Sequence, residues 1–152
     1  MRTETETVSI FTVIELAVLI ATVFAALSIL HLYWAVGGRW GHAAALPERH
    51  GQPAFRPGGI ATLLVAALLA TAGVLVLGRV GLGPAARLSR LTHVGVWIIA
   101  AAFLLRGLGD LRLIGVFRKV RDTRFAWWDR HVYTPLSIVL GLTTAIVATS
   151  TA

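Results

Sequence analysis

The sequence predicts an all-α, polytopic membrane protein in which four transmembrane helices form a single up-down bundle over residues 1–152. Hydrophobic residues make up 57% of the chain and charged residues 14%, and the mean hydropathy is +0.78, which is too apolar for an ordinary soluble domain. Four apolar runs are long enough to cross a bilayer core, which takes about 20 residues. The period-two alternation of a membrane barrel is absent, so helices are the way for these runs to satisfy their backbone groups in lipid.

The four predicted helices span residues 10–36, 59–78, 91–109 and 133–149. The first run is long, so we expect it to tilt or project, and it is too long for a cleaved secretory signal. We therefore expect a retained transmembrane helix at the N-terminus. Small residues at helical packing intervals in the second and fourth runs predict close helix contacts inside the bundle, namely Ala66, Ala70, Gly141 and Ala145.

The distribution of basic residues predicts the orientation of the bundle. Four spans place both termini and the loop 79–90 on one side, and the two long loops, 37–58 and 110–132, on the other. The long loops hold nine Lys and Arg residues and the opposite side holds four. The positive-inside rule then places the long loops in the cytoplasm of a bacterial inner membrane and both termini outside, although Arg79, Arg87 and Arg90 count against this.

The segment 111–128 is too short and too polar to span a membrane. Leu113, Phe117 and Val120 can share one helical face, and cations come from Arg118, Lys119, Arg121 and Arg124. We therefore expect an amphipathic helix in the interface, with Trp127 and Trp128 at headgroup depth and contacts to anionic lipid that contribute about 1 kcal/mol per basic residue. Thr134 is predicted to cap the N-terminus of the fourth helix.

Three charged residues near the membrane boundary are candidates for chemistry. Arg106 and Asp110 share a helix face, but Arg before Asp is the poorer order for such a pair, and an anion at a helix C-terminus is disfavoured. Either Arg106 forms an ion pair or reaches headgroups, or it binds an anionic headgroup or substrate. Asp129 either serves as an N-terminal anion for the fourth helix or pairs with Arg106.

Aromatic residues and a histidine close the first helix at the same end of the bundle. The structural interpretation is an aromatic belt of Tyr33 and Trp34 with a hydrogen-bonded His31. The functional interpretation makes His31 a general acid or base, with Tyr133 as a second proton-transfer group, because both emerge beside Arg106, Asp110 and Asp129. Trp34, Trp40 and Trp128 are then expected to contact the ligand.

Glu15 lies about two turns into the first apolar run, and His93 lies on the same side at the start of the third. An intramembrane carboxylate is a functional candidate by default. The alternatives are a structural hydrogen bond between helices and a proton-coupling site formed by Glu15 and His93.

Several functions are excluded or disfavoured by composition. The chain has no cysteine, so disulfides and thiolate chemistry are not available. We expect no cofactor and no metal site, because no two histidines have helical ligand spacing and no phosphate-binding glycine loop follows a strand. The net charge of +7 fits loops that contact lipid, and we expect no nucleic-acid partner.

Four motifs, HLYWAVGGRWG, LPE, RGLGDLRLIGVFRKV and FAWWDRHVYTPL, together resemble the bacterial family named domain of unknown function 3995. The resemblance implies a small four-helix membrane protein and covers most of the chain. It supplies no activity, and its pattern does not include Glu15. The matching residues are His31, Tyr33, Trp34, Gly37, Gly38, Trp40, Gly41, Arg106, Gly109, Asp110, Phe125, Trp128, Asp129, Tyr133, Pro135 and Leu136.

Three functions fit these features. The first is binding, or enzymatic conversion, of an amphipathic or lipid-like molecule in a polar pocket at the cytoplasmic end of the bundle. The second is a proton-coupled, multidrug-type exporter that works as a homodimer and uses Glu15. The third is a non-catalytic accessory subunit of a larger membrane complex.

Overall fold

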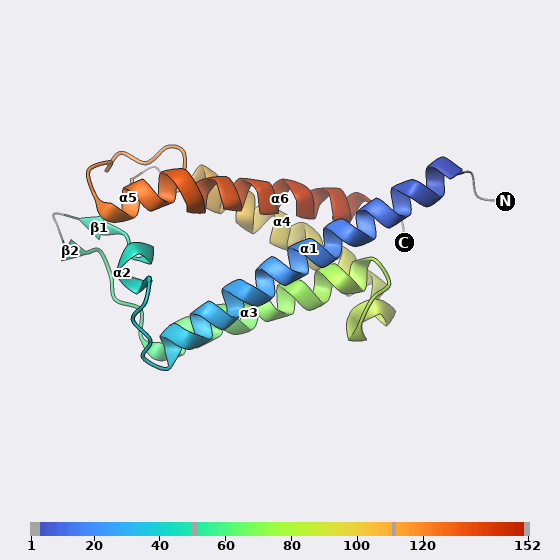
Figure 1. Cartoon of the computed structure of the whole chain (residues 1–152), viewed down its shortest axis with the longest axis horizontal. Coiled ribbons are helices and arrows are strands. Elements are labelled where there is room, and N and C mark those ends of the chain that lie inside the picture. Colours follow the sequence, from blue (N-terminus) through green and yellow to red (C-terminus); the bar gives the residue numbers. More distant parts are fainter. Residues whose placement is uncertain (1–3, 50–51, 111, 151–152) are drawn as a thin grey trace.

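The computed structural model describes residues 4–49, 52–110 and 112–150, with four helical segments long and apolar enough to cross a membrane. Three of them are α1 (Glu4–Ala35), α3 (Gly59–Arg79) and α4 (Ser89–Leu108), and the fourth runs from Arg124 to Thr149 and ends in α6 (Thr134–Thr149). They alternate in direction, so that both ends of the chain lie at one end of the bundle and both long loops at the other (Figure 1). The predicted four-helix membrane architecture is confirmed.

The remaining elements are short. The first long loop contains α2 (His42–Ala45) and an antiparallel ribbon of β1 (Glu48–Arg49) and β2 (Gln52–Pro53), with Glu48 opposite Pro53. A single 3₁₀ turn, η1 (Pro84–Arg87), joins α3 to α4. The fourth segment begins with α5 (Arg124–Trp128), continues through a π-helical turn, η2 (Asp129–Tyr133), and passes without a break into α6.

Two helical hairpins make up the bundle, α1 with α3 and α4 with α6. Glycines let α4 and α6 approach closely: a Cβ on Gly141 would lie 2.7 Å from Leu104, and one on Gly107 would lie 2.6 Å from Ile138. Ala66 of α3 is also buried, as the small-residue spacing predicted, but Ala70 is exposed. The packing prediction therefore holds for Gly141 and Ala66 and is wrong for Ala70.

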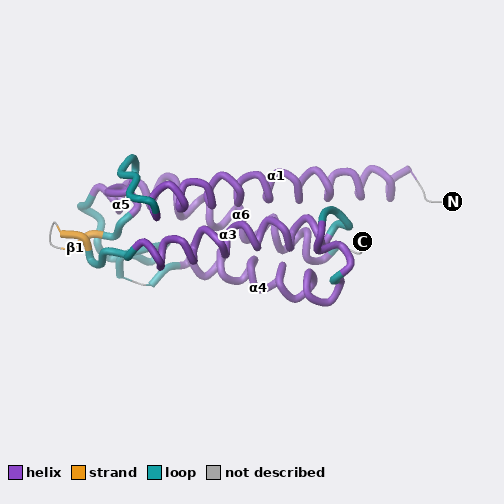
Figure 2. Tube along the Cα trace, turned by 90° about the horizontal axis from the view of Figure 1, so that it is seen from below, coloured by secondary structure: helices purple, strands orange, loops and turns teal. Residues whose placement is uncertain are grey.

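The hydrophobic core lies toward the end of the bundle that carries the termini. Between Phe11 and Ala35, the buried residues of α1 all fall between Ala17 and Phe24, and Phe24 contacts Phe103 of α4 with a ring separation of 5.2 Å. Beyond this contact the two hairpins diverge toward the long loops (Figure 1). At the opposite end, α1 projects past the other helices, as its length predicted (Figure 2).

At the terminal end, Arg79 closes the C-terminus of α6. Its guanidinium donates to the carbonyl oxygens of Ala148 and Ser150, carbonyls that have no intrahelical partner at a helix end. The Arg79 guanidinium therefore binds a helix C-terminus within the protein. Arg79 is thus weaker evidence against the predicted orientation than a basic residue that is free in a loop.

The helix predicted over residues 111–128 is wrong for residues 112–123, which form bends and turns. Gly109 and Gly115 adopt positive φ values of 90° and 80°, which interrupt a helix. The helix starts only at α5, where the Thr123 hydroxyl accepts from the Ala126 N–H at 3.1 Å. Thr123 is thus the N-cap, and the predicted cap at Thr134 is wrong because that residue lies inside the continuous helical segment.

Candidate functional site

A buried carboxylate organises the end of the bundle that carries the long loops. Asp129 is 0% exposed and lies at the first position of the π turn. Its Oδ1 accepts from Arg106 Nη2 at 2.6 Å. Its Oδ2 accepts from Arg118 Nη1 at 2.9 Å, from the Gly115 N–H at 2.9 Å and from the Thr134 hydroxyl at 3.0 Å.

These contacts join three parts of the chain. Arg106 comes from the last turn of α4, Gly115 and Arg118 come from the loop, and Thr134 lies one turn along the same helix. Of the two interpretations of Asp129, pairing with Arg106 is the one observed. A carboxylate with four donors holds the loop against the bundle, so the geometry supports a positioning role for Asp129.

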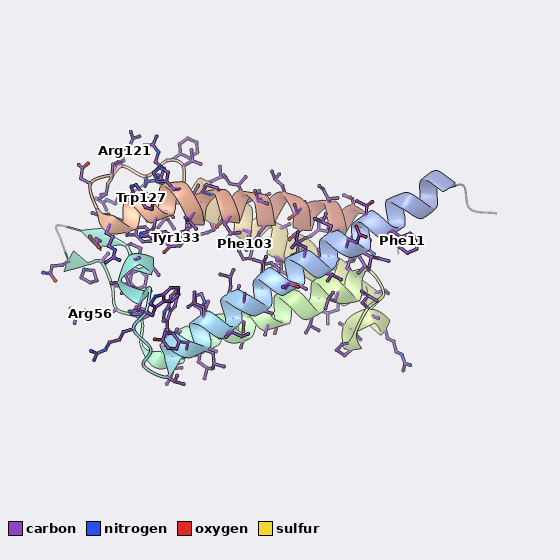
Figure 3. The ribbon with its side chains drawn as sticks, in the orientation of Figure 1. Phe11, Arg56, Phe103, Arg121, Trp127 and Tyr133 are labelled. Atoms are coloured by element: carbon purple, nitrogen blue, oxygen red, sulfur yellow. The ribbon has the colours of Figure 1, made fainter. Side chains whose placement is uncertain are left out.

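The loop and the α5–η2 segment enclose a pocket of about 340 Å³, which we call the basic pocket. Basic and aromatic side chains dominate its lining, and no carboxylate belongs to it: the lining residues are Val116, Arg118, Arg121, Ala126, Trp127, Arg130, His131 and Thr134. Arg121 of the loop and Trp127 of α5 lie at this end of the bundle, beside Tyr133 (Figure 3).

Arg118 is the fixed cation of the basic pocket. Its side chain is 9% exposed, and Nη1 donates both to the Gly115 carbonyl at 2.7 Å and to Asp129. Arg121 and Arg130 are exposed, so they are free to meet a ligand. The Asp129 carboxylate thus sets the position of one guanidinium, and two exposed ones line the same pocket.

The ring of His131 is held against α5. Its Nδ1 lies 2.8 Å from the Trp127 carbonyl oxygen, and its ring centre lies 4.6 Å from that of Trp127. Trp127 in turn contacts Trp128 edge to face at 5.2 Å. Trp127 is 56% exposed, which suits a side chain at the membrane interface beside the basic pocket.

Asp110 binds its own loop. Its Oδ1 accepts from the N–H groups of Arg112, Leu113 and Ile114 at 2.9, 2.6 and 3.0 Å. Partial burial favours a raised pKa for this carboxyl, but the N–H donors of Ile114, Leu113 and Arg112 outweigh it. The pKa therefore lies below its ordinary value of 3.8. Asp110 shapes the start of the loop and does not join Asp129.

His31 and Trp34 lie in a separate aromatic cluster at the end of α1. The His31 ring lies 5.0 Å from Trp34, and Trp34 lies 5.6 Å from His42. Trp34 Nε1 donates to the Trp40 carbonyl at 2.8 Å, and the Trp40 N–H donates to the Tyr33 hydroxyl at 3.3 Å. The backbone of Trp40 and the ring of His42 thus fold back onto the end of α1, whereas the Trp40 side chain is 76% exposed.

Tyr133 links this cluster with the Asp129 region. Its hydroxyl donates to the Ala44 carbonyl of α2 at 3.4 Å, and its ring lies 6.1 Å from Phe125 and 6.4 Å from Trp128. The predicted site residues therefore form two groups, Arg106 with Asp129 and His31 with Trp34, and Tyr133 lies between them. A second pocket of about 420 Å³ lies outside both groups, lined by His42, Ala43, Leu46, Glu48, Pro53 and Arg56.

Glu15 and His93 lie at the opposite end of the bundle, and both are exposed. Gly73 of α3 packs beside Ala21 of α1. Glu15 lies six residues before Ala21 on α1, and Arg79 lies six residues after Gly73 on α3. Because the two helices are antiparallel, both residues lie about 9 Å from that contact toward the same end of the bundle. Glu15 is therefore level with the end of α3. Among residues 4–49, 52–110 and 112–150 no hydrogen bond or ion pair joins Glu15 to His93, and no three His, Asp or Glu side chains converge as metal ligands.

Reasoning from the sequence did not single out the residues that line the basic pocket. Arg118 and Arg121 were expected only as cations of the interfacial segment, and Arg130 only as part of the basic charge of the loop. The available signal was the segment FAWWDRH directly before an apolar run, in which three aromatic residues are followed by an arginine and a histidine. The burial of Arg118 has no such signal, because it depends on how the loop folds back to Asp129.

Comparison with known proteins agrees with the motifs. The sequence model of a family described as a protein of unknown function, DUF3995, matches residues 24–144, which cover all four spans in part or whole. The match includes both His31 and Asp129. No curated protein and no solved structure was found to match the chain.

Proposed function

This chain belongs to the DUF3995 family, and on that premise we propose that it is a membrane protein that binds an anionic amphiphile. The headgroup of this molecule lies in the basic pocket, and its apolar part stays in the lipid. The observation that carries the proposal is a pocket of about 340 Å³ lined by three arginines and a histidine, with no carboxylate in its lining.

The charges favour an anion. Arg118, Arg121 and Arg130 surround the pocket, and the guanidinium group forms paired, charge-assisted hydrogen bonds with phosphate and carboxylate oxygens. Asp129 already holds Arg118 in place, so little side-chain freedom is lost there when a ligand binds. The exposed Arg121 and Arg130 can bind the same headgroup.

The position of the pocket favours an amphiphile over a soluble anion. The helical segment from Arg124 to Thr149 has 26 residues, whereas a hydrocarbon core takes about 20. Its first turns, which carry Trp127 and Arg130, therefore lie at headgroup level. A lipid can reach the pocket from its own leaflet. In this proposal Arg106 and Asp129 position the pocket, and Asp110 shapes the loop.

Lipid binding in the membrane tests this proposal. The full chain is reconstituted in zwitterionic vesicles with a low mole fraction of anionic lipid, and lipid retention is measured for Arg121→Gln/Arg130→Gln. Each charge-assisted bond contributes about 1.5–3 kcal/mol, so we expect at least about a tenfold loss of affinity.

The matched control is Arg112→Gln/Lys119→Gln, which removes the same charge from exposed positions of the same loop outside the pocket. We expect retention close to that of the unmodified chain. An equal loss in both variants, or no loss in either, would show that the anion is held by surface charge in general and would overturn the proposal.

We also propose that the long loops face the cytoplasm of a bacterial inner membrane. The support is the excess of basic residues in these loops and the use of Arg79 as a helix cap. Because the chain has no cysteine, single exposed positions can be labelled. An impermeant thiol reagent should label Arg87→Cys in intact cells and Asp122→Cys only after lysis, and the reverse pattern would invert the orientation.

A further inference from the structure

We propose that the basic pocket is specific for a lipid-borne phosphomonoester, a headgroup phosphate with one ester bond, over phosphodiesters and carboxylates. This inference rests on the proposed binding of an anionic amphiphile. The distinction comes from the imidazole acceptor that the pocket adds to its arginines, the Nε2 atom of His131.

The hydrogen bond at Nδ1 decides what Nε2 can do. A carbonyl oxygen only accepts, so the contact of 2.8 Å between Nδ1 and the Trp127 carbonyl requires the proton on Nδ1. In the neutral ring Nε2 is then an acceptor. The side chain of His131 is exposed and lines the pocket, so this acceptor is available to a ligand.

A phosphomonoester matches this combination of donors and acceptor. Its second ionisation lies near pH 6, so at neutral pH it exchanges between a form with one P–OH group and a dianion. The P–OH form donates to Nε2 while its charged oxygens accept from the arginines, and the dianion meets the protonated ring. In both cases one proton lies between phosphate and His131. A phosphodiester or an ionised carboxylate has no proton to supply.

The charge count agrees with the inference. Three guanidinium groups line the pocket, and the single negative charge of Asp129 is shared with Arg106 outside it. At least two positive charges of the lining therefore lack a counterion from the protein. A dianionic headgroup neutralises them, whereas a phosphodiester or a carboxylate supplies one negative charge.

The test compares headgroups at equal mole fraction in zwitterionic vesicles. For the full chain we expect phosphatidic acid, a monoester, to bind at least about tenfold more tightly than phosphatidylglycerol, a diester, or a fatty acid. His131→Phe keeps an aromatic ring against Trp127 and removes Nε2, so the preference should fall to the smaller margin that the arginine charges alone provide, and an undiminished preference would overturn the inference. His42→Phe, at the second pocket, should retain the full preference.

A measurement on the unmodified chain supplies a second readout. Phosphorus NMR follows the second ionisation of bound phosphatidic acid, which we expect at lower pH than in vesicles without protein, because arginines surround the phosphate. An unchanged ionisation would overturn the inference. Glycerol 3-phosphate has the same phosphate group without an apolar tail. If it displaced phosphatidic acid at an equal concentration, the conclusion that the phosphate is carried by a lipid would be overturned.

The outcomes separate the two proposals. Equal affinity for monoester and diester, together with weaker binding by Arg121→Gln/Arg130→Gln, overturns the specificity for phosphomonoesters and leaves the proposed function intact. If Arg121→Gln/Arg130→Gln binds the monoester and the diester as tightly as the unmodified chain does, both proposals are overturned.

Discussion

Replacing Asp129 with asparagine tests whether the buried carboxylate holds the long-loop end of the bundle together. Asparagine has nearly the same shape but carries no charge, and its NH₂ group faces donors. Arg106 and Arg118 then lose their common counterion, and the Gly115 N–H and the Thr134 hydroxyl compete for one carbonyl oxygen.

The burial of the two arginines sets the magnitude. Breaking a buried ion pair by removing one partner costs about 3–5 kcal/mol. The Arg106 side chain is 30% exposed and can turn toward headgroups, which relieves part of this cost, but that of Arg118 is only 9% exposed. We therefore expect Asp129→Asn to lower the free energy of unfolding by about 3 kcal/mol, or the melting midpoint by about 6–12 °C.

Thermal unfolding in detergent measures this effect. The control is Asp122→Asn, the same change at an exposed carboxylate of the same loop, which should stay within about 0.5 kcal/mol of the unmodified chain. Arg118→Gln added to Asp129→Asn should recover part of the loss, because it removes the uncompensated charge. If Asp129→Asn melts together with Asp122→Asn, the carboxylate does not stabilise the bundle and our account of the site is refuted.

Two further predictions concern the loop and the helix packing. The lowered pKa of Asp110 means that its carboxylate stabilises the loop above about pH 4 and loses this effect as the pH falls through the folded-state value. The protection of the Arg112–Ile114 amides, measured as their exchange rate relative to an unstructured peptide at the same pH, should fall over that range. Protection should be low at all pH values in Asp110→Ala and unchanged in Asp122→Ala. Gly141→Ala places a Cβ 2.7 Å from Leu104 Cγ and 3.0 Å from the Leu104 backbone nitrogen, so it should lower the free energy of unfolding by about 1–3 kcal/mol, measured by thermal unfolding. In the control Gly58→Ala the added Cβ meets open space, and the loss should stay below about 0.5 kcal/mol. Equal melting of the two variants would contradict the close approach of α4 and α6.

The apolar runs were sufficient to predict the four spans, because length and hydrophobicity decide which segments enter a bilayer. The predicted and observed bounds of α3 differ by one residue, at Arg79. The start of the fourth segment was mispredicted because Trp127–Thr134 is polar and aromatic and Pro135 is typical of a first helical turn. In the structure this proline lies within a continuous helix, as the second residue of α6 after the π turn.

The candidate site was predictable only in part. Arg106, Asp129 and Tyr133 were expected at one end of the bundle, because the order of the spans brings their helix ends together. Pairing of Asp129 with Arg106 was one of two alternatives, but its contacts with Gly115 and Arg118 were not predicted, since these residues reach it only through a loop whose path is set by Asp110 and two glycines with positive φ. Hydropathy contains no information about that path.

The π turn at Asp129–Tyr133 rotates the side chains of α5 relative to those of α6 within one continuous helical segment. One additional residue in a turn offsets the positions before it by about 100° relative to those after it, because an α-helix has 3.6 residues per turn. Shortening this turn by one residue would leave α6 aligned with α4 and swing Trp127 away from Arg118. The rotation of α6 relative to the side chains of α5 that line the basic pocket therefore depends on a single irregular turn of backbone.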